Sequence, residues 1–269
     1  RAEYMARTLY LFSKQTFPRG AFEIIIIDSS NDNTREVIRK AITEYGLNIR
    51  YFFIPPPTHG LDPRTSWQNM SVKMARGNVI VWTQPEMLFS ERMLEEFYKP
   101  HVLEDKLWVS GRIGVVNTKE EQMKIDQVWD KDLEYLFAHH NLGKEMFRLG
   151  YKYWVPVLAS FKKDDWLRIG GYEENLPIPR HCDLDIFFRM MAIGFSVHNP
   201  PGFQGIHQWH VPFEEKGKDI LPLSDKTRQI VYGLRRAFLR GEVCAEKYAK
   251  RNEGKEIGVV PELKEVFVV

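Results

Sequence analysis

The sequence has few of the features that mark membrane, disulfide-rich or nucleic-acid-binding proteins. No apolar run approaches the ~20 residues of a membrane-spanning helix, and residues 1–16 lack the apolar centre of a signal peptide. The two cysteines, Cys182 and Cys244, are too few for a disulfide scaffold, which favours a reducing, cytoplasmic compartment. The formal net charge of +2 is too small to favour nucleic acid or an anionic membrane.

The first half of the chain alternates strand and helix patterns. Residues 22–27 are a nearly continuous apolar run that ends at Asp28, which is typical of a strand buried in a parallel sheet. Turn and cap residues follow, then a helix pattern over residues 37–45, closed by Gly46. The alternation continues as strand, Pro-rich loop, helix and strand over residues 49–54, 55–63, 66–76 and 79–82. This order predicts an α/β protein with a doubly wound, mostly parallel sheet.

The second half is more mixed. We expect a strand over residues 107–116, an irregular aromatic-rich stretch over 124–154, and a helix over 183–192. A basic amphipathic helix is expected over residues 224–250. These patterns suggest three regions: residues 1–116, 117–215 and 216–269.

Candidate ligand-binding residues follow two of the predicted strands. In open parallel sheets, ligands bind at the carboxyl ends of the strands, where loops and helix N-termini converge. Asp28, Ser30 and Asp32 follow one strand and could hold a nucleotide, although Asp28 and Asp32 could equally be turn and cap residues. Glu86 follows the strand at residues 79–82 and could hold a divalent cation, or simply lie in a turn.

Asp183 and Asp185 begin the helix at residues 183–192. One carboxylate could face a cleft as a general base, while the other pairs with Arg189; taken alone, helix capping is the more common role for both. Further on, Trp209 could stack on a sugar. Two histidines beside it, His207 and His210, could bind a metal or diphosphate. A zinc site that joins these histidines to His181 and Cys182 is a less favoured alternative.

Taken in order, these segments resemble glycosyltransferase family 2, which has the GT-A fold, a Rossmann-like sheet with a smaller acceptor-side region. The run from Glu23 to Thr34 is similar to the family's strand and nucleotide loop. Asn69 and Ala75-Arg76-Gly77 resemble the helix before its metal motif, where this chain has Gln84-Pro85-Glu86 in place of Asp-x-Asp. Gly170-Gly171-Tyr172-Glu173-Glu174 resembles the acceptor-side segment, and Cys182-Asp183-Leu184-Asp185 the Glu-Asp-x-Asp motif.

The resemblance implies an inverting transfer of a sugar from a nucleotide-diphosphate donor to a hydroxyl of a glycan, lipid or protein acceptor. Asp183 would be the general base, and Asp28, Ser30 and Asp32 would bind the nucleotide. Mn²⁺ or Mg²⁺ would be held by Glu86, His207 and His210. The residues implied for acceptor or sugar binding are Gly171, Tyr172, Glu173, Asp185 and Trp209.

Two other interpretations stay open. The family's first strand, which precedes the helix at residues 5–12, has no counterpart, so another segment of a larger chain or assembly is expected to fill its place. That gap, Gln84 in the metal motif and Cys182 in place of Glu are also consistent with a catalytically degenerate domain that binds nucleotide or glycan or builds an assembly. A nucleotidyltransferase would need a Gly-rich, basic loop after its first strand, and none is evident.

Overall fold

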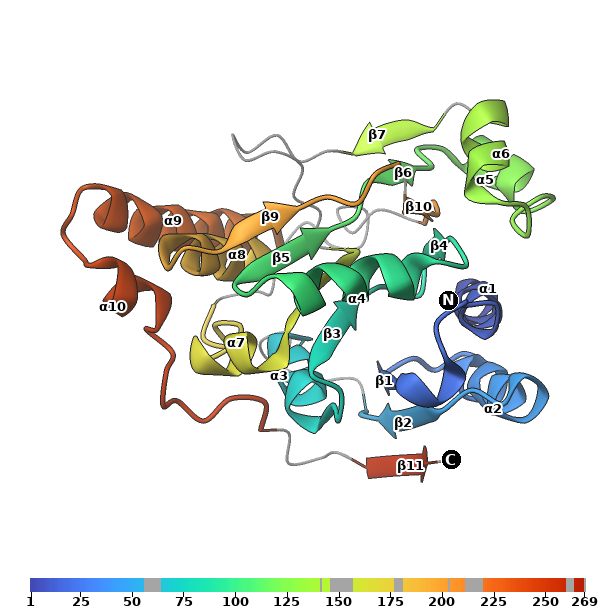
Figure 1. Cartoon of the computed structure of the whole chain (residues 1–269), viewed down its shortest axis with the longest axis horizontal. Coiled ribbons are helices and arrows are strands. Elements are labelled where there is room, and N and C mark those ends of the chain that lie inside the picture. The colour runs from blue at the N-terminus through green and yellow to red at the C-terminus, as the bar shows by residue number, and fades with distance from the viewer. Residues whose placement is uncertain are drawn as a thin grey trace.

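Three small sheets and the helices around them build the protein. A computed structural model (Figure 1) describes residues 1–55, 64–140, 142–145, 157–176, 181–202, 204–210, 220–259 and 264–268. The expected Pro-rich loop therefore lies almost wholly outside the described residues, as does the aromatic stretch after residue 145. None of the described helices combines the length and the apolar composition that crossing a lipid bilayer requires.

The first sheet contains the apolar run seen in the sequence. Strand β1 (Ile24–Asp28) pairs in parallel with β2 (Ile49–Phe53), and β11 (Lys264–Val268) pairs with β2 on its other edge in the antiparallel direction. Helices α1 (Ala2–Ser13) and α2 (Thr34–Tyr45) lie together beside this sheet, with the 3-10 turn η1 (Arg19–Ala21) before β1 (Figure 1). Gly46 ends α2 with φ +61°, a left-handed conformation that glycine adopts without strain.

The second sheet joins both halves of the sequence. Its order is β3 (Val79–Trp82), β8 (Ala159–Lys162), β5 (Leu107–Ser110) and β9 (Ser196–His198). Only the β5–β9 pair in this sheet is parallel. The helices that pack around it are α3 (Arg64–Met74), α4 (Met93–Leu103), α7 (Lys163–Arg168) and α8 (Cys182–Ala192). The predicted division at residue 116 thus runs through a region whose strands alternate in space.

The third sheet and the C-terminal helices complete the described fold. The sheet order is β4 (Met87–Phe89), β10 (Gly205–His207), β6 (Ile113–Val115) and β7 (Gly143–Glu145). Helices α5 (Lys119–Ile125) and α6 (Leu133–His139) lie near its outer end in Figure 1. Helices α9 (Ile220–Leu239) and α10 (Ala245–Ala249) lie against α8.

Three sequence expectations were wrong in detail. The single strand expected over residues 107–116 is two strands in different sheets, and the chain turns between them at Gly111, where a Cβ atom would lie 2.9 Å from the Phe97 ring. The stretch expected to be irregular from residue 124 includes α6, which Asp132 caps. The tail is two helices because Gly241, with φ +76°, interrupts the α-helical backbone.

Candidate active site

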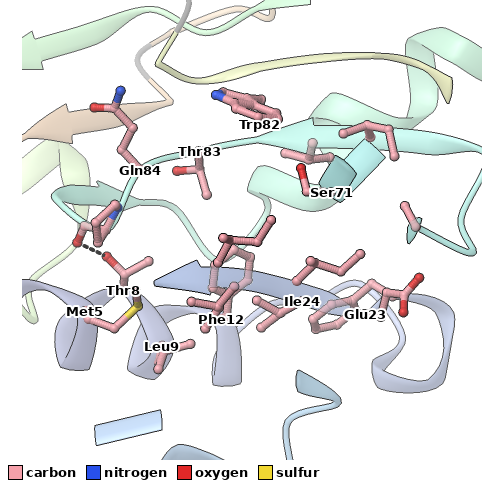
Figure 2. Close-up of a pocket in the computed structure, with 18 of the residues that line it drawn as sticks. Met5, Thr8, Leu9, Phe12, Glu23, Ile24, Ser71, Trp82, Thr83 and Gln84 are labelled. Atoms are coloured by element: carbon pink, nitrogen blue, oxygen red, sulfur yellow. Dashed lines mark hydrogen bonds between the residues drawn. The ribbon is translucent and has the colours of Figure 1, made fainter. Parts of the chain in front are cut away.

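A cavity of about 1100 Å³ lies between β1 and β3. Its inner part is apolar: Met5, Leu9 and Phe12 of α1 line it, together with the side chains of β1 and β3 (Figure 2). Its mouth is polar and lies where β1 and β3 end; the residues that line it there include Arg1, Asp28, Ser30, Asp32, Arg64 and Gln84. All three residues predicted to bind the nucleotide therefore line one cavity.

Asp28 is the last residue of β1, and local hydrogen bonds fix its carboxylate. The Ser30 main-chain N–H donates to Oδ1 at 2.8 Å, and the Tyr51 hydroxyl donates to Oδ2 at 2.8 Å. Burial and the hydrogen bond to Asp28 raise the pKa of Tyr51 to about 12, so this hydroxyl stays protonated and remains a donor at neutral pH. The Asp28 side chain is half-buried, which leaves part of it open to the cavity.

Arg1 joins the loops that follow β1 and β3. Its amino group forms an ion pair with Asp32, and its guanidinium forms one with Glu86. Burial raises the pKa of Asp32, but hydrogen bonds from the amino terminus and from Thr34 outweigh this and hold it well below its usual value. Because each carboxylate lies four positions after its strand, these contacts place the carboxyl ends of β1 and β3 side by side.

The predicted metal ligands gather behind Arg1. Glu86 is fully buried, neither of its carboxylate oxygens accepts a hydrogen bond from the described residues, and His210 Nε2 lies 3.6 Å from Oε1. The His207 and His210 rings lie 5.2 Å apart. Burial, then the nearby His210 and Arg1, lower the pKa of His207 to about 4, so its imidazole is neutral at pH 7 and keeps a lone pair for a ligand.

This donor set suits a divalent cation in part. A buried carboxylate without hydrogen-bond donors favours a positive partner, and oxygen with imidazole nitrogen suits Mn²⁺. Within the described ranges, however, no three His, Cys, Asp or Glu side chains are close enough together to enclose an ion. The zinc site of His181, Cys182, His207 and His210 is therefore not formed. Glu86 and the two histidines lie together, and a diphosphate would have to complete their coordination.

Asp183 lies at the start of α8, just after His181, which has a left-handed backbone conformation with φ +69°. Among the described residues, its carboxylate bonds only to its own helix, where the Leu184 N–H donates at 2.9 Å. Burial raises the pKa of Asp183 to about 6 despite that bond. No direct contact joins Asp183 to Asp28 or Glu86, so their meeting around one cleft stays a prediction.

Arg64 provides an electrostatic link between the cavity mouth and α8. It lines the cavity, and after burial its charge is the largest cause that lowers the pKa of Arg1. Its charge also acts on Cys182, where burial raises the thiol pKa well above its usual value and Arg64 offsets a small part of this. Arg64 is thus within electrostatic range of both Arg1 and the residue before Asp183.

The predicted acceptor-side residues divide between a buried scaffold and the surface around it. Gly171 has φ +54°, and a Cβ there would lie 2.3 Å from Asn69 Oδ1, so only glycine fits. The Tyr172 ring is buried. Trp209 is half-buried, with its N–H donating to Gln122 at 2.8 Å and its C=O accepting from the Tyr4 hydroxyl at 2.7 Å.

Asp185 and Glu173 are held by basic side chains from the segment after α10. Asp185 is fully buried and forms ion pairs with Arg251 and, at 3.6 Å, with Arg189. Glu173 lies 3.8 Å from Arg251 and 3.4 Å from Lys255. These contacts favour a structural role for both carboxylates, and their acceptor role stays a prediction. The sequence offered no indication of Arg251, because a contact across 66 positions leaves no local pattern.

Solved structures of the same fold define the class of this protein. TarS of S. aureus superimposes with a TM-score of 0.56 at 15% identity, covering 88% of this chain and 41% of that chain. The mannosyltransferase PcManGT of Pyrobaculum calidifontis, solved with GDP-Man and Mn²⁺, superimposes with a TM-score of 0.51 at 15% identity, covering 94% and 70%. GalNAc-T7, solved with UDP, GalNAc and Mn²⁺, gives 0.54 at 12% identity, covering 91% and 51%. The fold is that of the GT-A glycosyltransferases.

The sequence narrows this class to one family. The model described as "Glycosyl transferase family 2" matches residues 1–155, which is more than half of the chain. The chain belongs to glycosyltransferase family 2. Among curated proteins, no sequence match was found. The chain spans 41% of the length of TarS, so it represents the catalytic-fold portion of such a protein and not its whole length.

Proposed function

We propose that this protein transfers a sugar from a nucleotide-diphosphate donor to an acceptor hydroxyl, with inversion at the anomeric carbon. The observation that carries the proposal is the contact of Arg1 with both Asp32 and Glu86. It means that the loop implied to bind the nucleotide and the residue implied to face the diphosphate share one rim of one cavity. The solved relatives with UDP or GDP-Man support this class of donor.

The proposed roles follow from the chemistry of each side chain. Asp28, already oriented by Tyr51, accepts hydrogen bonds from the base or ribose. Asp183 takes the proton of the acceptor hydroxyl while the acceptor oxygen forms a bond to the anomeric carbon. The bond between that carbon and the diphosphate oxygen breaks, and the nucleoside diphosphate leaves with the electron pair. A base with a pKa near 6 is ionised at neutral pH and still accepts a proton.

Arg1 and Arg64 bring positive charge to the mouth, where the leaving diphosphate gains negative charge. Glu86, His207 and His210 would hold a divalent ion, which neutralises the departing diphosphate when bound. The described residues supply part of a coordination shell, so the donor's own oxygens are needed to complete it.

A non-catalytic nucleotide-binding domain is the second candidate. The ion pair between Glu86 and Arg1 favours it, because a protein cation already neutralises the only carboxylate of the altered metal motif. Such a domain would bind a nucleoside diphosphate without Mn²⁺ and would release no sugar.

A donor-hydrolysis screen with Asp183→Asn as the matched variant tests the proposal. UDP- and GDP-sugars are incubated with the protein and Mn²⁺, with and without glycan acceptors, and release of nucleoside diphosphate is measured. We expect acceptor-stimulated release by the native chain and a loss of 10²-fold or more in the variant, whose nucleotide binding is unchanged. Full activity in Asp183→Asn would remove this residue as the base.

A further inference from the structure

The inner part of the cavity is bounded by the open edges of two strands. Strand β1 pairs with β2 on one side, and β3 pairs with β8 on one side; among the described residues neither has a strand on its other side. Both strands line the same cavity, β1 with Ile24 to Asp28 and β3 with Val79 to Trp82 (Figure 2). We call this inner part, between β1 and β3, the strand slot.

The hydrogen-bond pattern shows which peptide groups face the strand slot. In β1, the Ile24 N–H donates to Asn48 O at 2.8 Å and the Asp28 C=O accepts from Ile54 at 2.9 Å, so the even-numbered residues face β2. Because successive residues of a strand direct their peptide groups to opposite sides, Ile25 and Ile27 face the slot.

The same argument applies to β3. Lys163 N–H donates to Asn78 O at 2.8 Å, and the register pairs Val79 with Lys162, so the even-numbered residues of β3 face β8. Val79 and Val81 therefore face the slot. Four residues thus direct N–H and C=O groups into one apolar cavity, where unpaired peptide groups are costly.

The direction of the slot follows from Arg1. Since Arg1 contacts Asp32 after β1 and Glu86 after β3, both strands run towards it, and they are parallel to each other. Arg1 itself lines the cavity. A third strand parallel to both would end beside the amino nitrogen of Arg1. Helix α1, 12 residues long, would then form the helical crossover that two parallel strands require.

We propose that the strand slot is the seat of one further β-strand of about five apolar residues, parallel to β1 and β3 and joined by a peptide bond to Arg1. Ile25 and Ile27 on one side, and Val79 and Val81 on the other, supply its hydrogen bonds, as in recognition by strand addition. Met5, Leu9 and Phe12 of α1 cover one of its faces. A small molecule could not bond to two strand edges along their length, and a separate peptide would lack the fixed end that Arg1 provides.

Hydrogen exchange tests the proposal. In the 269-residue chain, the amides of Ile25, Ile27, Val79 and Val81 should exchange much faster than those of Ile26 and Ile80. A chain extended before Arg1 by five Val and Ile residues should protect these four amides and raise Tm by about 5 °C or more. The matched control carries Pro at the second and fourth added positions, and should do neither.

Two further outcomes make the test decisive. Unchanged exchange at the four amides in a folded extended chain, or equal protection by the Pro control, would overturn the proposal. If the extended chain precipitates, the same Val/Ile peptide is added as a separate molecule: slowing of the four amides supports the slot, and no slowing at millimolar peptide overturns it. A separate peptide that protects fully while a soluble fusion does not would overturn the link to Arg1. None of these readouts depends on sugar transfer.

Discussion

Asn69 and Tyr172, 103 positions apart, are joined by two main-chain hydrogen bonds: Asn69 Nδ2 donates to the Tyr172 C=O at 3.0 Å, and the Tyr172 N–H donates to Asn69 Oδ1 at 2.8 Å. Asn69 is fully buried and also binds Trp166 Nε1 and the Glu174 carboxylate. One side chain of α3 thus fixes the Gly-Gly-Tyr-Glu-Glu segment. This explains why an Asn before the metal motif and a Gly-Gly pair far along the chain occur in one sequence.

We expect Asn69→Ala to destabilise the protein by roughly 3 kcal/mol, because it leaves both peptide groups of Tyr172 buried without a partner. Urea unfolding followed by tryptophan fluorescence measures the effect. Ser71→Ala, which removes only a local bond to Gln68, is the control and should cost much less. Equal stability of the two variants would contradict the assigned role of Asn69.

Asp183 gives a prediction that couples activity to stability. Its pKa is raised from 3.8 to about 6 by burial, so the folded state loses stability as the pH rises from 4 to 6 and the carboxylate ionises. Asp183→Asn should therefore be more stable than the native chain by about 2–3 kcal/mol above pH 6 and equally stable below pH 4. Thermal unfolding at pH 4 and pH 7 tests this, with exposed Asp164→Asn as the control.

The same group sets the expected pH dependence of transfer. A general base must be ionised, so kcat should fall tenfold per pH unit below about pH 6. The rate is measured at saturating donor and acceptor between pH 4.5 and 8. An activity that stays constant down to pH 5 would assign the acid limb to another group.

Arg251 is expected to hold the C-terminal segment onto the acceptor-side motif. Arg251→Met leaves the Asp185 carboxylate buried with Arg189 as its remaining ion-pair partner, which should cost about 3–5 kcal/mol. Adding Asp185→Leu should recover part of that loss, as a double-mutant cycle measures. Arg240→Met, which breaks an exposed pair with Glu242, should cost under ~1 kcal/mol. A loss at Arg251 no larger than this control would show that the buried pair contributes little.

Local structure could be predicted from the sequence wherever a pattern is local. The apolar run to Asp28, the helix closed by Gly46 and the strand at residues 79–82 are confirmed, because hydrophobic periodicity and caps lie within a few positions. The break at Gly111 was missed because its cause is Phe97, which belongs to α4.

The site could be predicted only up to residue types. Motif order indicated Asp28, Glu86 and Asp183, but not that Arg1 would pair with Glu86 or that Arg251 would bury Asp185. Those partners depend on the packing of distant segments. The absence of a first strand was evident from the order of motifs, whereas its consequence, a slot lined by four unpaired peptide groups, required coordinates.

Calorimetric titration of UDP and GDP, with and without Mn²⁺, tests the central claim that the ends of β1 and β3 form one nucleotide-diphosphate site. One nucleotide should bind, Mn²⁺ should strengthen its binding, Asp28→Asn should weaken it, and Glu86→Gln should abolish the Mn²⁺ effect while exposed Glu91→Gln keeps it. Absence of binding in all conditions, or binding that neither substitution alters, would contradict the account.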